Sequence, residues 1–274
     1  LREDVGLMPI VSLTTRRTLP TFALLDDIVT VLGGTKLTFW PFIQAVGTTL
    51  SPYGSGTDGV LLTASAAIES AFPPFQHGGG IYSLKNSSVQ TLVTVDNANF
   101  SFGDGTIDSP FSLGAWLLME EAVGTARSII AKYRTSAATA REYDFRFGTD
   151  GKLVLELYDQ SAAATEIATS TGTALDPFVW QFVTMTYDGG ETAPVVNLYI
   201  NATSVHDGTT AETGAYVAME DLTEVLMVGS RNSAAQGQVF VGRVALPFVT
   251  GKELTAAEVT TVYNIGRRLL GLTD

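Results

Sequence analysis

The chain has 274 residues with 28 acidic and 16 basic side chains, and its formal net charge of −12 disfavours nucleic acid and anionic membrane surfaces as partners, because both repel an acidic protein. The absence of cysteine excludes disulfides, thiolate zinc sites and cysteine nucleophiles. A hydrophobic fraction of 45% with 16% charged residues indicates a globular chain, and 27 glycines indicate many turns.

The first predicted element is a short amphipathic helix within residues 19–34. Pro20 lies near its start and Gly33-Gly34 ends it. Asp26 and Asp27 are expected on its solvated face. The apolar side chains that recur at helical offsets are Leu24, Leu25, Ile28, Val31 and Leu32. We assign residues 1–35 to an N-terminal arm that carries this helix outside the main domain.

The arm has a second apolar group ahead of the helix. Its members are Leu7, Met8, Ile10, Val11 and Leu13. These residues are too few to fold alone, so we expect them to gain order by docking on a partner or on a copy of this chain.

From Lys36 onward the hydrophobic period changes from 3.6 to 2, which indicates antiparallel strands. The clearest hairpin joins residues 141–147 to 152–159, because Asp150-Gly151 supplies the positive φ that a tight turn needs. A second hairpin joins residues 183–187 to 196–200. Further strands are expected at residues 111–118, 127–133, 224–229 and 238–248.

A short helix is predicted near residue 255 and after it. Thr255 and Glu258 have the spacing of a capping box, and Leu254 and Val259 that of a hydrophobic staple. One face of the helix is expected to contain Leu254, Ala257, Val262, Ile265 and Leu269. The strands before it, apolar on one face and polar on the other, favour an all-β fold of two antiparallel sheets over residues 36–274.

Seven segments follow one another in a specific order: FSLGAWLLME, SIIAKY, EYDFRFGTDGKLVLELYD, WQFVTMTYDGG, VVNLYIN, LMVGSRN and FVGRVALPFVTGKELTAAEVTTVY. This order resembles the concanavalin A-like, laminin-G-like jelly-roll family, and LTFWPF with IYSLKNSSVQTLVTVDNANFSF resembles its opening strands. The resemblance spans about residues 36–270 and implies a jelly-roll sandwich. Asn201-Ala202 stands where the family usually has Asn-Gly, and Leu246-Pro247 replaces a commoner charged residue.

The resemblance also implies a place for calcium, because similar lectin-type modules often hold the ion on a rim loop through carboxylates. Candidate ligands are Asp96, Asp104, Asp108 and Asp188. The same residues are favoured in turns for backbone hydrogen bonding alone, so our first expectation is a chain without a cofactor.

Some members of this fold resemble laminarinase-type glucanases, which carry E-x-D-x-x-E on one strand so that two carboxylates share a face for retaining hydrolysis. Glu142 and Asp144 match this pattern, but Phe147 replaces the last carboxylate. We therefore expect no enzyme, and a solvent-facing strand edge with Glu142, Asp144 and Arg146 in line. A hydrolase that pairs Glu142 with Glu156 is kept as an alternative.

Three further patterns favour structural readings. Residues 54–59 fit G-x-G-x-x-G but lack a preceding strand and a following helix, so a loop is expected. His77 and His206 lie in turn sequences without zinc or triad spacing. The tryptophans lie in alternating strands, where core packing explains them better than a sugar platform: Trp40, Trp116 and Trp180.

An arm attached to a sandwich without a complete catalytic set predicts a binding or assembly module. By analogy with similar modules, we expect a non-enzymatic structural or accessory protein of a bacteriophage virion, a capsid decoration or a tail or fibre component. Its arm would bind other virion proteins or copies of itself, and its jelly roll would face cell-surface glycans. Outside a particle we expect the protein to be extracellular. The alternatives are a free carbohydrate-binding lectin, calcium-dependent in one version, and a glycan hydrolase.

Overall fold

The computed structural model describes residues 20–41, 49–53, 59–61, 68–70, 82–86, 91–135, 140–172, 174–190, 195–231 and 237–272. The predicted docking residues of the arm lie outside this part of the chain: Leu7, Met8, Ile10, Val11 and Leu13. His77 and residues 54–58 of the glycine-rich segment also lie outside it.

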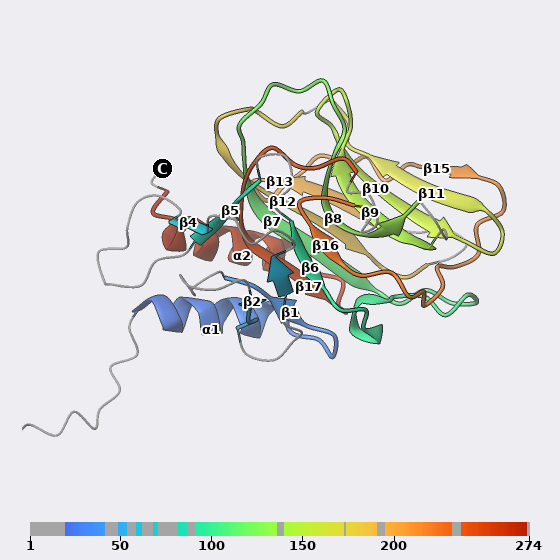
Figure 1. Cartoon of the computed structure of the whole chain (residues 1–274), viewed down its shortest axis with the longest axis horizontal. Coiled ribbons are helices and arrows are strands. Elements are labelled where there is room, and N and C mark those ends of the chain that lie inside the picture. The colour runs from blue at the N-terminus through green and yellow to red at the C-terminus, as the bar shows by residue number, and fades with distance from the viewer. Residues whose placement is uncertain are drawn as a thin grey trace, which may run out of the picture.

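The described strands form two antiparallel sheets that stack as a sandwich (Figure 1), which confirms the predicted jelly roll. Sheet A has the order β14 (Thr203–Ser204), β13 (Val196–Ile200), β12 (Trp180–Tyr187), β7 (Phe111–Met119), β17 (Gly242–Thr250), β5 (Tyr82–Asn86) and β4 (Ile68–Ser70), with β1 (Thr38–Phe39) also paired to β17. Sheet B has the order β15 (Thr210–Thr213), β11 (Ala164–Thr169), β10 (Leu153–Asp159), β9 (Ala140–Phe147), β8 (Arg127–Arg134), β16 (Met227–Val228), β6 (Leu92–Thr94), β3 (Gly59–Leu61) and β2 (Thr49–Leu50). A short 3₁₀ helix, η1 (Ala98–Phe100), follows β6.

The main core lies between the two sheets. Tyr143, Phe145 and Phe147 alternate along β9 and point into it, as the period of the sequence predicts. Phe102 stacks on Phe111 within this core, with ring centroids 4.3 Å apart. Both predicted hairpins are present, as β9–β10 and β12–β13.

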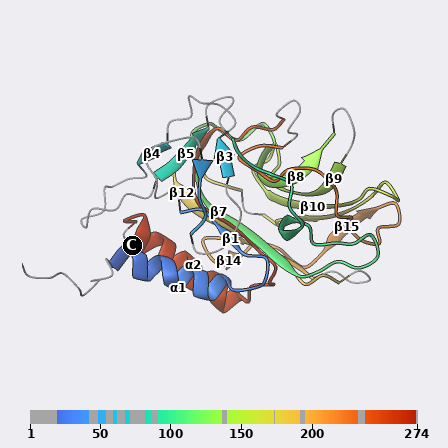
Figure 2. The same cartoon turned by 60° about the horizontal axis from the view of Figure 1, so that its bottom comes forward.

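The outer face of sheet A is covered by two helices, α1 (Pro20–Leu32) and α2 (Ala256–Leu269), which lie side by side (Figure 2). They form a second buried cluster with aromatic side chains of the sheet. Its principal members are Leu25, Ile28, Leu32, Trp116, Phe182, Phe248, Val259, Val262 and Leu269. The prediction that residues 20–32 form a helix is confirmed, but the prediction that this helix lies outside the main domain is wrong, because its apolar stripe is buried against α2.

The end of α1 is joined to the sheet by side chains from the last residue of β17 and from the loop that follows it. Thr250 Oγ1 donates to the carbonyl oxygens of Leu32 and Gly33, at 3.1 and 2.8 Å. Lys252 Nζ donates to the carbonyl oxygen of Val31 at 3.1 Å. Because these carbonyls would otherwise be unsatisfied at the helix end, the contacts fix α1 on its own domain.

The capping box of α2 is present as predicted, with Thr255 and Glu258 bonded reciprocally. Ala257, which was expected on the buried face, is exposed, and Val259, two residues further on, is buried. Asp26 and Asp27 of α1 are exposed, as predicted.

Two strands begin later in the chain than expected. The strand predicted at residues 224–229 is reduced to β16, and the one predicted at 238–248 begins at Gly242. The register of β17 on β7 shifts between Ala245 and Phe248, where Leu246 has φ +51°. Pro247 cannot donate to the ladder, so this departure from the family pattern produces a bulge.

Candidate functional site

The predicted exposed acidic strand edge on β9 is not present. Glu142 and Asp144 are both 0% exposed, and β9 lies inside sheet B between β8 and β10. Lys132 pairs with Tyr143 and Tyr133 with Arg141, so the ladder skips Glu142, which is the extra residue of a bulge. The alternation of apolar and polar residues in the sequence predicts neither this bulge nor the burial of Glu142 and Asp144.

Glu142 is held by a buried ammonium group rather than by solvent. Lys132 Nζ contacts Glu142 Oε1, donates to Ser101 Oγ at 3.0 Å and lies 3.3 Å from Asp96 Oδ1. Burial raises the pKa of Glu142 to about 7, against the lowering effect of Lys132. Lys132 and Glu142 therefore form a buried structural ion pair. Burial weakens the preference of the Glu142 side chain for its charged form.

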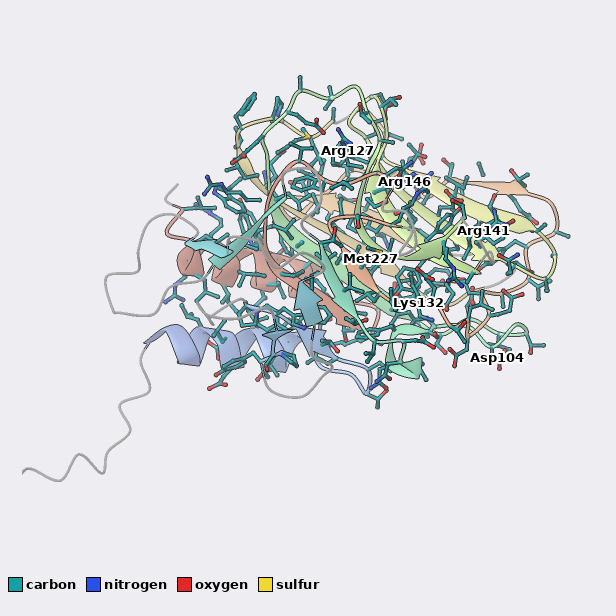
Figure 3. All side chains as sticks on the ribbon, viewed as in Figure 1. Asp104, Arg127, Lys132, Arg141, Arg146 and Met227 are labelled. Atoms are coloured by element: carbon teal, nitrogen blue, oxygen red, sulfur yellow. The ribbon has the colours of Figure 1, made fainter. Side chains whose placement is uncertain are left out.

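The second carboxylate pair on this sheet is neutralised by arginine (Figure 3 shows Arg146 on sheet B). Glu156 pairs across the ladder with Asp144 and not with Glu142. Arg146 Nη1 lies 2.7 Å from Glu156 Oε2, and Arg231 Nη1 lies 2.9 Å from Asp144 Oδ2. The two glutamates that a hydrolase was suggested to pair are therefore not opposite each other in the ladder, and each contacts a different cation.

The predicted calcium ligands are engaged in separate local contacts. Asp104 Oδ1 accepts the N–H groups of Thr106 and Ile107, each at 2.8 Å, and these bonds lower its pKa. Asp188 Oδ1 accepts from two backbone N–H groups of the β12–β13 connection at 2.8 and 3.0 Å. Both therefore have the turn-forming role that the sequence also predicted for these residues.

Asp108 is buried and accepts the hydroxyls of Tyr187 and Tyr216 at 2.8 and 2.5 Å, while Asp96 faces Lys132. In the described part of the chain, no three His, Cys, Asp or Glu side chains are placed together as metal ligands. The structure accordingly does not join the four predicted aspartates into one calcium site there.

His206 does not form a dyad with Asp207. Its two ring nitrogens each lie 2.8 Å from a backbone carbonyl oxygen, those of Val196 and Thr209. Asp207 Oδ1 instead accepts from Thr209 within the same turn. The predicted turn role of this histidine is confirmed.

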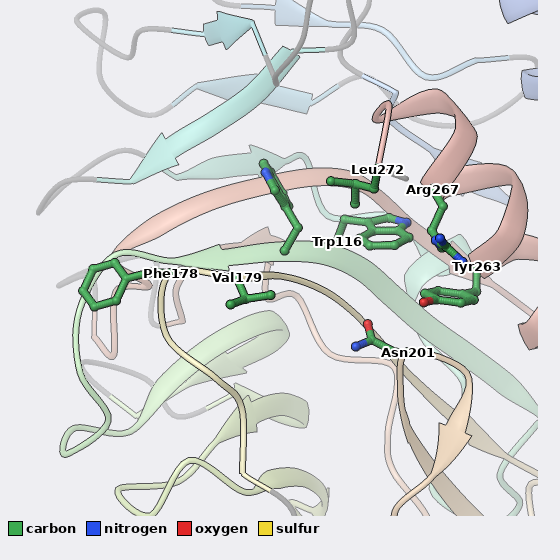
Figure 4. Close-up of a pocket in the computed structure, with 8 residues that line it drawn as sticks. Trp116, Phe178, Val179, Asn201, Tyr263, Arg267 and Leu272 are labelled. Atoms are coloured by element: carbon green, nitrogen blue, oxygen red, sulfur yellow. The ribbon is translucent and has the colours of Figure 1, made fainter. Parts of the chain in front are cut away.

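An open pocket of about 560 Å³ lies on the outer face of sheet A, beside α2 (Figure 4). We call it the α2 pocket. Its lining residues come from β7, β12, the loop before β12, the β13–β14 turn, α2 and the tail after α2: Trp116, Phe178, Val179, Trp180, Asn201, Tyr263, Arg267 and Leu272.

The aromatic wall of the α2 pocket follows from strand alternation. Trp116 pairs across the ladder with Phe182, so both lie on the outer face, and Trp180 lies two residues along from Phe182 on the same face. Tyr263 of α2 stacks on Trp116, with centroids 5.5 Å apart and planes at 13°. The guanidinium of Arg267 lies over the Tyr263 ring, 5.5 Å from its centroid.

The polar corner of the pocket is set by a tight turn. Asn201 and Ala202 have φ of +51° and +61°, as a two-residue turn between β13 and β14 requires. Asn201 Oδ1 accepts the backbone N–H of Phe182 at 2.9 Å. This bond fixes the amide orientation, so the NH₂ group of Asn201 is the part left to bond a ligand.

The rim of the pocket carries an unusual aromatic residue. Phe178 is 67% exposed and has φ +63°, a left-handed conformation that is unfavourable for a bulky side chain. Its backbone N–H donates to the carbonyl oxygen of Met119 at 2.8 Å, which holds it there. Strain of this kind concentrates at ligand sites, where it positions a side chain.

The three tryptophans differ in how far they are buried. Trp40 and Trp116 are buried, as predicted, and Trp180 is half-buried; Trp116 and Trp180 both line the α2 pocket. Sequence reasoning missed this pocket because its walls come from distant segments. The exposed hydrophobic pair Phe178-Val179 directly before Trp180 is the one local signal that could have indicated it.

Comparison with known proteins identifies similar folds. A family model described as the concanavalin A-like lectin/glucanases superfamily matches residues 88–260, and no curated protein matches the chain. The binding domain of Paraclostridial mosquitocidal protein 1 has a TM-score of 0.57 at 11% identity, over 85% of this chain and 52% of that one. The Trypanosoma rangeli sialidase in complex with sialic acid has a TM-score of 0.57 at 11% identity, over 93% of this chain and 39% of that one.

The binding domain of botulinum neurotoxin DC in complex with SialylT has a TM-score of 0.55 at 14% identity, over 85% of this chain and 52% of that one. This chain therefore spans about half or less of each of these structures, and identities this low show the fold alone. Neither helix in the described residues is long and apolar enough to cross a membrane.

Proposed function

Because the chain belongs to the concanavalin A-like lectin/glucanases superfamily, we propose that it is a non-enzymatic glycan-binding module whose binding site is the α2 pocket. The observation that carries the proposal is the combination of Trp180, Tyr263 and Phe178 with Asn201 and Arg267 in one open concavity. Ligand sites of this kind pair a mostly apolar lining with a few convergent polar groups.

The chemistry of the pocket fits a sugar ring. A pyranose has an apolar C–H face that packs on aromatic rings, and hydroxyls at its edge that need hydrogen-bond partners. The half-buried Trp180 and the exposed Phe178 offer ring surface, while Asn201 offers the N–H donors of its side-chain amide. Two of the similar structures are named as complexes with sialic acid and SialylT, which supports a glycan as the class of ligand.

A binding role is favoured over hydrolysis by the placement of the carboxylates. The described lining of the α2 pocket contains no Asp or Glu. On sheet B, Glu142 is paired with Lys132 and Glu156 with Arg146, whereas a retaining glycosidase needs an acid and a nucleophile about 5 Å apart beside the substrate.

Glycan-array binding of the intact chain tests the proposal, with Trp180→Ala as the pocket variant. Val217→Ala is a matched control, because Val217 is an exposed apolar residue that does not line the pocket. We expect array signals that Trp180→Ala lowers and Val217→Ala leaves unchanged. A flat array, or signals that both variants keep in full, contradicts a glycan site in this pocket.

For the biological setting, we propose display on a bacteriophage particle, as a capsid decoration or a tail component. The supporting observation is the apolar group within residues 1–19, which precedes α1: Leu7, Met8, Ile10, Val11 and Leu13. Since α1 is packed on its own domain, the anchor in this proposal is reduced to residues 1–19. Mass spectrometry of purified particles tests it: incorporation of a variant without residues 1–19 at the full level contradicts the anchor.

A further inference from the structure

We propose that the α2 pocket selects N-acetylated sugars, and that Asn201 and Tyr263 recognise the acetamido group of the ligand. This inference rests on the proposed glycan-binding function and adds the chemical class of the sugar, which includes N-acetylhexosamines and N-acetylated sialic acids. An acetamido group combines a carbonyl acceptor, an N–H donor and an apolar methyl group. The described lining of the α2 pocket offers a partner for each of the three.

The donor for the acetamido carbonyl is the side-chain NH₂ group of Asn201. Asn201 is bound to Phe182 twice: its backbone N–H donates to the Phe182 carbonyl oxygen at 2.8 Å, and its Oδ1 accepts the Phe182 N–H at 2.9 Å. These two bonds fix the residue and show which side of the amide carries the NH₂ group. No hydrogen bond uses this NH₂ group within the part of the chain that the structure describes, so its donors remain for a ligand.

The second polar group is the hydroxyl of Tyr263, which can accept the N–H of the same acetamido group. The Tyr263 ring stacks on the buried Trp116 with centroids 5.5 Å apart, so its orientation is fixed. Figure 4 shows the hydroxyl directed to the side of the pocket where Asn201 lies. Among the described residues this hydroxyl has no hydrogen-bond partner. An oriented amide and an oriented hydroxyl therefore face a ligand from the β13–β14 turn and from α2.

The methyl group of the ligand is matched by the apolar part of the lining. Phe178 and Val179 are exposed, and Trp180 and Leu272 are half-buried, so their apolar surface is accessible. A methyl group that leaves water for such a surface is stabilised, whereas a hydroxyl in its place loses hydrogen bonds to water that the surface cannot replace. An acetamido group is therefore favoured here over the hydroxyl that an unacetylated sugar carries.

The test compares two pairs of sugars in which an acetamido group replaces one hydroxyl: N-acetylglucosamine with glucose, and N-acetylgalactosamine with galactose. Calorimetry of the intact chain should give about 10-fold tighter binding for the acetylated member of at least one pair, because the methyl contact and the added hydrogen bond both contribute. If neither acetylated sugar binds more tightly than its partner, the acetamido preference is wrong.

Two variants assign the preference to the two polar groups. In Asn201→Asp the carboxylate still accepts the Phe182 N–H and tolerates the left-handed φ of +51°, but the NH₂ group is lost, so the preference should fall to about 2-fold or less. Tyr263→Phe keeps the ring and loses only the hydroxyl, and should lower the preference by about 3-fold. Asn99→Asp changes an exposed asparagine outside the pocket lining by the same charge, and this matched control should keep the full preference.

The outcomes separate the two proposals. If Asn201→Asp and Tyr263→Phe both keep the full preference, or if Asn201→Asp weakens the two members of a pair equally, recognition of the acetamido group by these residues is wrong and glycan binding by the pocket stands. If none of the four sugars binds and the glycan array is flat, the proposed function is wrong and the inference fails with it.

Discussion

Replacement of Phe178 separates backbone strain from ligand binding at one position. Phe178 has φ +63° and is 67% exposed, so about a third of its side-chain area, roughly 60 Å², is buried. At about 25 cal/mol per Å², loss of the ring costs about 1.5 kcal/mol of stability in both Phe178→Ala and Phe178→Gly. Only glycine relieves the left-handed backbone, which returns about 1 kcal/mol.

The expected order of unfolding free energies is therefore wild type, then Phe178→Gly, then Phe178→Ala, with the two variants separated by about 1 kcal/mol. Urea denaturation followed by circular dichroism measures this difference. Glycan affinity should fall by the same factor, about 3- to 10-fold, in both variants, because both lose the ring.

Ala163→Gly is the matched control for strain relief. Ala163 has φ +53° and lies in the β10–β11 turn of sheet B, outside the lining of the α2 pocket. This variant should be about 1 kcal/mol more stable than the wild type and bind glycan unchanged. The reasoning is refuted if Phe178→Gly is no more stable than Phe178→Ala, or if glycan affinity follows stability rather than the presence of the ring.

Three further predictions address the fold. Leu25→Ala should lower the unfolding free energy by about 2–5 kcal/mol in urea denaturation, because Leu25 is fully buried between the helices and sheet A; a loss below 1 kcal/mol would mean that α1 is not docked. Thr255→Ala should cost about 1 kcal/mol through the capping box of α2, with exposed Thr260→Ala as control, and equal losses would contradict the capping role. Because Glu142 has a folded pKa of about 7 against an ordinary value of 4.5, the folded state binds more protons between these values, so stability should fall as pH rises through that window. Glu142→Gln should flatten this fall, and an unchanged pH profile would show that another group titrates there.

Local sequence patterns were sufficient to predict the individual helices and hairpins. The β9–β10 and β12–β13 hairpins, the capping box and the helix at 20–32 each depend on neighbours within a few residues, so their sequence patterns predicted them. The place of α1 depends on α2, more than 200 residues away, which no local pattern contains. The sequence therefore predicted the helix and misplaced it.

The same limit applies to the sites. A period of 2 separates the two faces of β9 but does not show which face is covered, and it does not show that Glu142 is a bulged residue that pairs with Lys132. The α2 pocket needs Trp116, Phe178, Asn201 and Tyr263 in one place, and only the topology brings them together. The aspartates of the turns were predicted with both of their possible roles, and backbone hydrogen bonding is the role that the structure shows for Asp104 and Asp188.

The most direct test of the glycan site uses the three tryptophans of the chain as internal probes. Each indole N–H gives its own signal in a ¹⁵N–¹H NMR spectrum, and Trp40 is a buried core residue that does not line the α2 pocket. Titration with sialyllactose should shift the signals of Trp180 and Trp116 and leave that of Trp40 in place. Unchanged signals for Trp180 and Trp116 at saturating ligand would contradict binding in the α2 pocket.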